Sequence, residues 1–259
     1  MRYEMLGTLQ VVDSESCRTV AGKKFETVLA TLLVRSPEIV THEQLTMEIW
    51  GARPPGRASA GLHVYISRLR KFLVSQDQPV SPVGTKPSGY TLQVRDNQVD
   101  FAEFVQLVEQ GRRYMREGRF AAATSCLDKA LNLWRGPVLG GHGRGPITSG
   151  FITRMDETRL EGLELMTDAQ LGLGLHRELV GRLYSLTSEH PLREAFHRQL
   201  MIALYRSERQ ADALKAYHVA RTTLREELGV EPGWALRELQ QAILQDDHRR
   251  LSPSAALMG

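Results

Sequence analysis

The sequence predicts a mainly α-helical protein with small β elements, built in two successive parts, and three patterns in the chain predict it. Amphipathic helical segments followed by a strand-like hairpin occupy residues 1–98. Helical patterns separated by short breaks fill residues 99–246. The charge divides at the same place, because residues 1–98 hold 12 Lys and Arg against 9 Asp and Glu, whereas the remainder holds 21 of each. We therefore expect two domains, 1–98 and 99–246, and a flexible tail at 247–259.

The first two helical segments are indicated by apolar spacing and by a capping pattern. Residues 24–35 carry apolar side chains at helical intervals, which predicts a core helix. Residues 41–50 begin with Thr41 and continue with Gln44, the spacing of a capping box. Gly51 then ends this helix, and the two prolines that follow force a turn.

The third helical segment lies in a stretch without acidic residues. Residues 49–76 run for 28 positions with no Asp or Glu, although 24% of the chain is charged. Within them, residues 57–73 place Leu62, Ile66 and Leu69 on one face, and small or basic side chains on the other. The basic residues of the stretch are Arg53, Arg57, Arg68, Arg70 and Lys71. A slim, basic helix face is typical of a nucleic-acid-binding element, and an ordinary solvated helix is the alternative.

Short strands are expected on both sides of these helices. Residues 80–83 lead into a turn and residues 90–94 lead out of it, which predicts a hairpin closed near a glycine. Lys86 lies at the tip of that hairpin, where a cation can enter a minor groove. Two further strands are expected at 2–7 and 9–12. This order of helices and hairpin is that of a winged helix-turn-helix.

The second part of the chain reads as paired helices. Asp100 and Glu103 have the spacing of a capping box that opens a helix, and a second helix is expected at 120–134. An offset of 34 residues relates Ala169, Glu178 and Val180 to Ala203, Asp212 and Leu214. Paired helices with that period are typical of tetratricopeptide-like repeats, which hold other proteins and seldom carry catalysis.

Several classes of protein are disfavoured by the composition. No apolar run approaches the roughly 18 residues that span a bilayer, and the amino end lacks a secretion signal. Cys17 and Cys126 fit no metal or redox spacing, which favours thiols in a reducing cytoplasm. The glycine cluster at 140–145 lacks the Lys and Ser/Thr of a phosphate loop, so a flexible connection is favoured over a ligand loop. We expect no catalytic residues, no metal and no cofactor, and therefore no enzyme.

Seven motifs, in order along the chain, carry a resemblance to a known family. They are residues 48–51, 62–73, 84–92, 131–137, 189–194, 204–207 and 227–232. The second and third resemble the OmpR-type winged helix. Together, over residues 1–245, they resemble the Streptomyces antibiotic regulatory protein family of transcriptional activators, whose second half is a tetratricopeptide-like bacterial transcriptional activation domain.

The resemblance implies a function and a set of contact residues. The expected function is activation of a secondary-metabolite (antibiotic) gene cluster, by binding direct repeats in double-stranded DNA near the −35 region and recruiting RNA polymerase. The base contacts implied are His63, Val64, Ser67 and Arg68. The phosphate contacts implied are Arg57, Tyr65, Arg70 and Lys71, with Lys86 acting from the wing.

The resemblance also implies partners. The turn formed by Gly51, Arg53, Pro54 and Pro55 is expected to touch RNA polymerase at its sigma subunit. Two copies are expected side by side on DNA, in the cytoplasm at the nucleoid, without a membrane. The alternative is a protein-interaction adaptor that uses the helical repeats and does not read DNA sequence. Salt dependence separates the two, because binding through several phosphates weakens steeply as salt rises.

Overall fold

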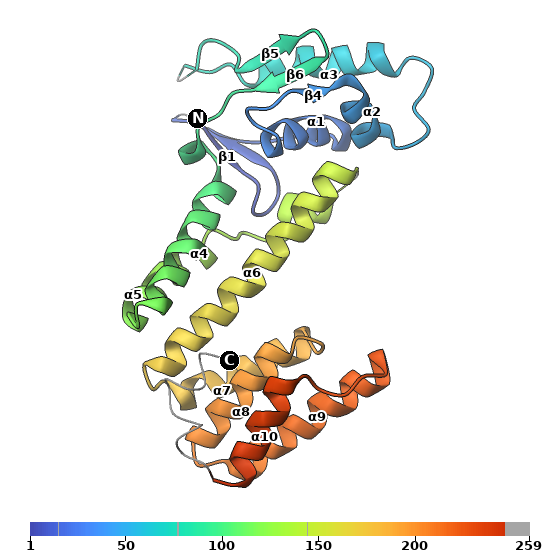
Figure 1. Cartoon of the computed structure of the whole chain (residues 1–259). Coiled ribbons are helices and arrows are strands. Elements are labelled where there is room, and N and C mark those ends of the chain that lie inside the picture. The colour runs from blue at the N-terminus through green and yellow to red at the C-terminus, as the bar shows by residue number, and fades with distance from the viewer. Residues whose placement is uncertain (15, 77, 144, 247–259) are drawn as a thin grey trace. The chain divides into compact units, whose positions relative to one another are not determined.

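The computed structural model describes residues 1–14, 16–76, 78–143 and 145–246, so the tail expected at 247–259 lies outside the described residues. Its helices are α1 (Lys23–Val34), α2 (His42–Trp50), α3 (Ala58–Phe72), α4 (Asp100–Arg116), α5 (Phe120–Leu131), α6 (Pro146–Gly172), α7 (His176–Glu189), α8 (Glu194–Arg206), α9 (Gln210–Leu228) and α10 (Trp234–Leu244). Its strands are β1 (Arg2–Glu4), β2 (Gln10–Val12), β3 (Cys17–Thr19), β4 (Val40–Thr41), β5 (Val83–Lys86) and β6 (Gly89–Leu92). Two short 3₁₀ helices are η1 (Asp96–Gln98) and η2 (Val138–Gly141). The mainly helical fold with small sheets is the one expected (Figure 1).

The chain forms two compact units. The first contains residues 1–109 and 129–160, and the second contains residues 110–128 and the described residues from 161 onward. Both units draw on residues before and after position 128, because α4, α5 and α6 each have one part in either unit. The domain boundary at residue 98 stays a prediction.

The amino-terminal sheet of the first unit has one strand more than the sequence indicates. Its order is β1-β2-β3, all antiparallel, with Tyr3 opposite Val11 and both side chains fully buried. Strand β3 pairs Arg18 with Val11, yet its own residues are exposed or half-buried. The residues of β3 show no apolar alternation, so the sequence did not predict this strand, and it is recognised from its pairing with β2.

The winged helix-turn-helix follows in the same unit. Helices α1, α2 and α3 pack on one another, beside a sheet with strand order β4-β6-β5. The predicted capping box of α2 is confirmed, since the Gln44 amide donates to the Thr41 hydroxyl at 3.1 Å and the Thr41 amide donates to the Gln44 side chain at 2.9 Å. The hairpin strand expected at 80–83 begins instead at Val83, because Val80 is 76% exposed and has no pairing partner.

Helix α4 begins at the expected residue but for a different reason. The carboxylate of Asp100, 2% exposed, accepts the amides of Met5 at 2.8 Å and Leu6 at 2.9 Å. Glu103 accepts from Arg2 at 2.8 Å. The capping-box interpretation of Asp100 and Glu103 is therefore wrong, because both carboxylates face residues near the amino terminus. Burial raises the pKa of Asp100, and the amides of Leu6 and Met5 oppose that rise.

Helix α5 is shorter than predicted. It ends at Leu131 and not at Trp134, since the amide of Trp134 bonds back only three residues, to Leu131. The Trp134 ring instead packs edge-on against Phe104 at 5.4 Å, with the Arg159 guanidinium 4.7 Å from its centre. The motif at 131–137 therefore ends the helix and supplies a half-buried aromatic ring to the first unit.

The second unit repeats one turn three times. The turns before α5, α7 and α9 place Gly118, Gly174 and Glu208 in the left-handed region, at φ 69°, 84° and 64°. After each, the next amide bonds to the carbonyl five residues earlier, at 2.9–3.1 Å. Helices α7 and α9 start at His176 and Gln210, so the predicted period of 34 residues is confirmed. Helix α8 packs between α7 and α9, and α10 packs on α8 and α9.

Candidate nucleic-acid interface

Helix α3 presents two contrasting faces. Ala58, Leu62, Ile66 and Leu69 are buried against the first unit. At about 100° per residue, Ala60, Val64, Ser67 and Lys71 point within roughly 40° of the direction opposite that stripe. All four are exposed. The helix is thus held by its apolar stripe, and it exposes a face of small side chains with one central cation.

The four predicted base-contacting residues share this exposed side. Val64, 56% exposed, and Ser67 lie near its centre. His63 lies on the edge next to the hairpin, where its Nδ1 is 2.9 Å from the hydroxyl of Tyr90. Arg68 lies on the opposite edge, with its guanidinium 5.1 Å from the ring centre of Phe25. Their contacts with bases stay predictions.

The predicted phosphate-contacting residues occupy less uniform positions. Arg57 precedes the first turn of α3 and is exposed, as is Lys71. Tyr65 is half-buried beside Trp50, with ring centres 6.3 Å apart. Lys71 lies as centrally as the predicted base contacts, so the helix geometry alone does not assign it to a phosphate.

Arg70 has a structural role that the sequence did not indicate. Its Nε donates to the Val83 carbonyl at 3.3 Å, and its Nη2 donates to the Thr85 hydroxyl at 2.5 Å. Both acceptors belong to β5. Arg70 therefore ties the hairpin to α3, and a phosphate contact stays a prediction for its other donors.

The hairpin beside α3 is a two-residue turn between β5 and β6, with Lys86 opposite Gly89 (Figure 1). Lys86 is exposed at the end of β5, immediately before the turn, as predicted for the wing. Gly89 is required there, because a Cβ at this position would lie 2.0 Å from the Val40 carbonyl oxygen. The wing is therefore held against β4 through its backbone.

The turn predicted to contact polymerase is exposed. Gly51 ends α2 at φ 70°, in the left-handed region that favours glycine. The residues after it are exposed through Arg57, and the Ala58 amide closes the turn by donating to the Pro55 carbonyl at 2.9 Å. Arg53 is thus presented to solvent together with Pro54 and Pro55.

The cations of this surface lack acidic partners. In the described part of the chain, none has a carboxylate within ion-pairing distance. They are Arg53, Arg57, Arg68, Arg70, Lys71 and Lys86. By contrast, many arginines elsewhere in the chain, such as Arg112 with Glu161, are paired. The positive charge around α3 is therefore uncompensated and available to an anionic partner.

Gly145, the last residue of the glycine cluster, lies at an internal contact. Glu48 of α2, 1% exposed, accepts the amides of Ile147 at 2.6 Å and Thr148 at 3.1 Å, and the Thr148 hydroxyl at 2.8 Å. A Cβ on Gly145 would lie 2.5 Å from that carboxylate. The amides that would hold a phosphate at the start of α6 already bind Glu48, which argues against the ligand-loop alternative.

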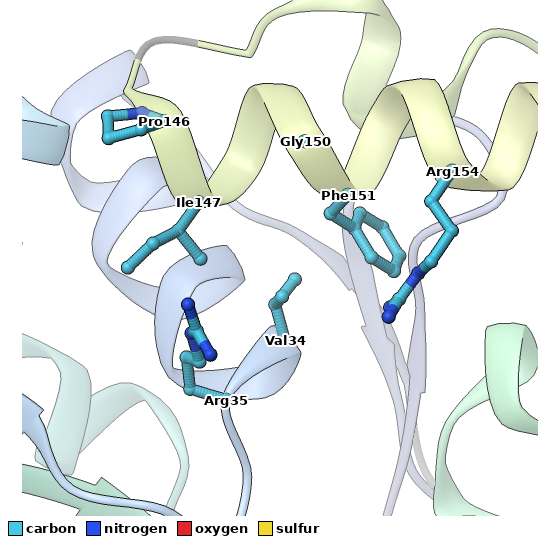
Figure 2. Close-up of a pocket in the computed structure, with 7 residues that line it drawn as sticks. All are labelled: Val34, Arg35, Pro146, Ile147, Gly150, Phe151 and Arg154. Atoms are coloured by element: carbon cyan, nitrogen blue, oxygen red, sulfur yellow. The ribbon is translucent and has the colours of Figure 1, made fainter.

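A shallow hollow of about 230 Å³ lies beside this contact, between the end of α1 and the first turns of α6 (Figure 2). Figure 2 shows the Ile147 side chain pointing toward Val34, the last residue of α1, and Arg35 after it, with Phe151 and Arg154 following along α6. Phe151 is buried and packs edge-on against Phe101 at 4.9 Å. The hollow is thus the rim of a packed contact.

Two further properties hold for the described ranges. Every helix there is too short or too polar to span a bilayer. Within the same ranges, no three His, Cys, Asp or Glu side chains gather as a metal site.

Comparison with known proteins identifies the family. Residues 19–92 match the family described as "Transcriptional regulatory protein, C terminal", and residues 99–244 match the "Bacterial transcriptional activator domain". Regulatory protein DnrI of Streptomyces peucetius is 35% identical over 253 residues, which are 95% of this chain and 93% of that protein. The chain belongs to the Streptomyces antibiotic regulatory protein family. This regulator family member thus combines an OmpR-type winged helix with a bacterial transcriptional activator domain.

Two more relatives define how far the similarity extends. Regulatory protein AfsR of Streptomyces coelicolor is 37% identical over 99% of this regulator, which spans about a quarter (25%) of the AfsR length. The solved structure of Mycobacterium tuberculosis EmbR in complex with a low-affinity phosphopeptide matches with a TM-score of 0.90 and 33% identity. That match covers 98% of this regulator and 69% of the EmbR chain.

Sequence reasoning assigned no role to Glu48 or Tyr90 of this regulator. Glu48 lies in one of the recognised motifs, yet a lone acid at the end of a helix gives no sign of a partner a hundred residues away. Tyr90 is the second residue of β6, and its hydroxyl reaches His63 only because the hairpin packs beside α3.

Proposed function

We propose that this regulator activates transcription by binding promoter DNA through α3 and the β5–β6 hairpin. The observation that carries the proposal is the set of cations around the exposed face of α3 that have no acidic partner among the described residues. Phosphates neutralise such cations, and the counterions released make affinity fall steeply with salt. The small side chains at the centre of the face suit close approach to a major groove.

The contacts divide into base reading and positioning, as the resemblance to the OmpR-type winged helix implies. The base edges are read by His63, Val64, Ser67 and Arg68. The phosphates are held by Arg57, Tyr65, Lys71 and the remaining donors of Arg70, while Lys86 enters the neighbouring minor groove. Two copies bind side by side on direct repeats near the −35 region. The promoters are those of a secondary-metabolite (antibiotic) gene cluster, and the regulator acts in the cytoplasm at the nucleoid.

Activation uses the exposed turn after α2. Its residues Gly51, Arg53, Pro54 and Pro55 contact RNA polymerase at the sigma subunit. Support comes from the exposure of this turn at the end of α2 and from the guanidinium of Arg53, which has no ion-pair partner among the described residues. An exposed cation next to a DNA-binding helix can touch a protein that occupies the neighbouring promoter element.

The DNA-binding proposal is tested by genome-wide footprinting and by affinity measured across salt concentrations. We expect the intact protein to protect short direct repeats, and the Arg68→Ala/Lys71→Ala variant to lose that protection. Loss of the Lys71 phosphate contact would also reduce the salt slope by about 0.9, the value for one phosphate. The control is Arg177→Ala/Lys215→Ala, which removes two exposed cations from the second unit.

Two results would contradict the proposal. If both double variants lost DNA protection equally, binding would depend on the net charge of the protein and not on the exposed face of α3. Absence of any protected site for the intact protein would favour the adaptor alternative, and partner capture on the helical repeats would then follow.

The polymerase contact needs a separate experiment. Transcription from a protected promoter is reconstituted with purified polymerase, and Arg53→Ala is compared with the intact protein. We expect an unchanged footprint and reduced transcript. Equal transcript at saturating protein would refute a role for Arg53.

A further inference from the structure

His63, on the hairpin edge of α3, is held by a buried tyrosine. The hydroxyl of Tyr90 lies 2.9 Å from Nδ1 of His63, and the Tyr90 side chain is 3% exposed. The His42 ring packs edge-on against Tyr90, with ring centres 5.2 Å apart. Tyr90 is therefore fixed by packing, and one nitrogen of the exposed His63 ring is directed toward the protein.

The direction of this hydrogen bond follows from its partners. In the described residues, the Tyr90 hydroxyl has no other hydrogen-bond partner. If Nδ1 carried the proton and donated to Tyr90, the shielded phenolic O–H would be left without an acceptor, which is unfavourable. The Tyr90 hydroxyl therefore donates and Nδ1 of neutral His63 accepts. A neutral imidazole then carries its single proton on Nε2.

The Nε2–H group is the outward edge of the ring. His63 is exposed, and Nε2 has no hydrogen-bond acceptor among the described residues. Its neighbours along the face, one turn before and one turn after, are the short side chains of Ala60 and Ser67. A donor of fixed position is thus presented on a face slim enough to approach base edges.

We propose that Tyr90 is a positioning residue that fixes His63 as an Nε2–H donor, and that this donor selects a guanine in the operator. The inference rests on the proposed function, since it needs α3 in the major groove. Guanine presents two adjacent acceptors there, N7 and O6. Adenine presents N7 beside an amino donor, thymine presents the single acceptor O4 beside a methyl group, and cytosine presents only a donor. A single N–H donor without an acceptor beside it is therefore best matched by guanine.

The proton position can be tested without DNA. Long-range ¹H–¹⁵N spectra of the full chain, recorded at mildly alkaline pH, report which His63 nitrogen is protonated. We expect Nε2 alone in the intact protein and a mixture of the two tautomers in Tyr90→Phe. Protonation of Nδ1 in the intact protein would overturn the inference directly.

The selectivity is tested on a footprinted operator in which each guanine in turn is replaced by adenine or by 7-deazaguanine. At one position we expect at least adenine, which places an amino donor where guanine has the O6 acceptor, to weaken binding of the intact protein about tenfold. In Tyr90→Phe, which keeps the packed ring, that cost should fall to about two- to threefold, with affinity for unrelated DNA unchanged. In His63→Ala the cost should disappear, and adding Tyr90→Phe should change nothing further. Tyr184→Phe removes an exposed hydroxyl from the second unit and serves as the control.

The outcomes distinguish the positioning role of Tyr90 from the proposed binding of DNA by α3. If Tyr90→Phe weakens binding equally to operator and unrelated DNA, Tyr90 supports the hairpin and does not act through His63. If its effect persists in the His63→Ala background, the positioning role is likewise overturned. An intact protein that selects direct repeats but is indifferent to every guanine refutes this inference and leaves the proposed function standing. An intact protein without a specific site overturns both.

Discussion

Replacement of Glu48 by Gln isolates the contact between α2 and the start of α6. The side chain keeps its shape but loses its charge and one acceptor atom. In the intact protein the carboxylate accepts three hydrogen bonds, at 2.6 Å from the Ile147 amide and at 3.1 and 2.8 Å from the Thr148 amide and hydroxyl. A carboxamide has a single oxygen and an NH₂ group that only donates.

The magnitude follows from these three bonds. With its oxygen toward Ile147, the carboxamide of the Glu48→Gln variant can donate to the Thr148 hydroxyl, but the Thr148 amide loses its acceptor. One buried amide is therefore left unsatisfied, which costs about 1–3 kcal/mol. Loss of negative charge at the first turn of α6 costs roughly 0.5–1 kcal/mol more. We expect Glu48→Gln to lower the free energy of unfolding by about 1.5–4 kcal/mol.

Local hydrogen exchange is the assay of choice, because a protein with two compact units need not unfold in one step. We expect exchange of the Thr148 amide to quicken by between about tenfold and several hundredfold, since each step of about 1.4 kcal/mol is a factor of ten. Glu43→Gln, on an exposed position of the same helix, is the control and should change stability by less than about 0.5 kcal/mol. Unchanged exchange at Thr148, with a stability loss as small as that of the control, would refute the reasoning.

Three further predictions concern single positions. Glu208→Gly should raise the free energy of unfolding by about 0.5–1 kcal/mol in urea, because Glu208 holds φ 64° where glycine is unstrained; a loss of stability would contradict this. Because burial raises the pKa of Asp100 above its ordinary value of 3.8, its stabilising contribution is complete below that value and is lost as pH rises through the raised pKa. In urea unfolding, the free energy of unfolding of the intact protein should therefore decline as pH rises, and that of Asp100→Asn should not. Parallel pH profiles of the two proteins would contradict this role of Asp100. Arg70→Ala should remove two hydrogen bonds to β5, lower stability by about 1–2 kcal/mol and speed exchange in the hairpin, whereas Lys71→Ala should leave both unchanged. Equal exchange in the two variants would show that Arg70 does not hold the hairpin.

The candidate interface could be predicted in outline because its signals are local. A stretch without acids, an apolar stripe at helical spacing and a hairpin after it are all visible in consecutive residues. Arg70 shows where such reasoning stops. Its type and position on α3 favour a phosphate contact, yet β5 lies close enough to take two of its donors. A side chain with several donors is assigned by its neighbours, and those come from a distant part of the chain.

The same limit applies to the acids of the first unit. Asp100 and Glu103 have the spacing of a capping box, and their carboxylates nevertheless bind Met5, Leu6 and Arg2. Spacing predicts what a side chain can reach within its own helix. The spacing gives no information about a competing donor that lies about a hundred residues away in the sequence.

The sequence by itself determined the helical period of the second unit, the capping box of α2, the position of the wing and the sign of the charge around α3. Each of these depends on residues within about one or two turns of one another, where backbone geometry restricts the outcome. Only the tertiary structure decided that Glu48 binds the start of α6, that Arg70 holds the hairpin and that Tyr90 orients His63. These contacts join residues 13 to 100 positions apart, and a hydrogen bond between such residues exists only after packing has brought donor and acceptor within about 3 Å.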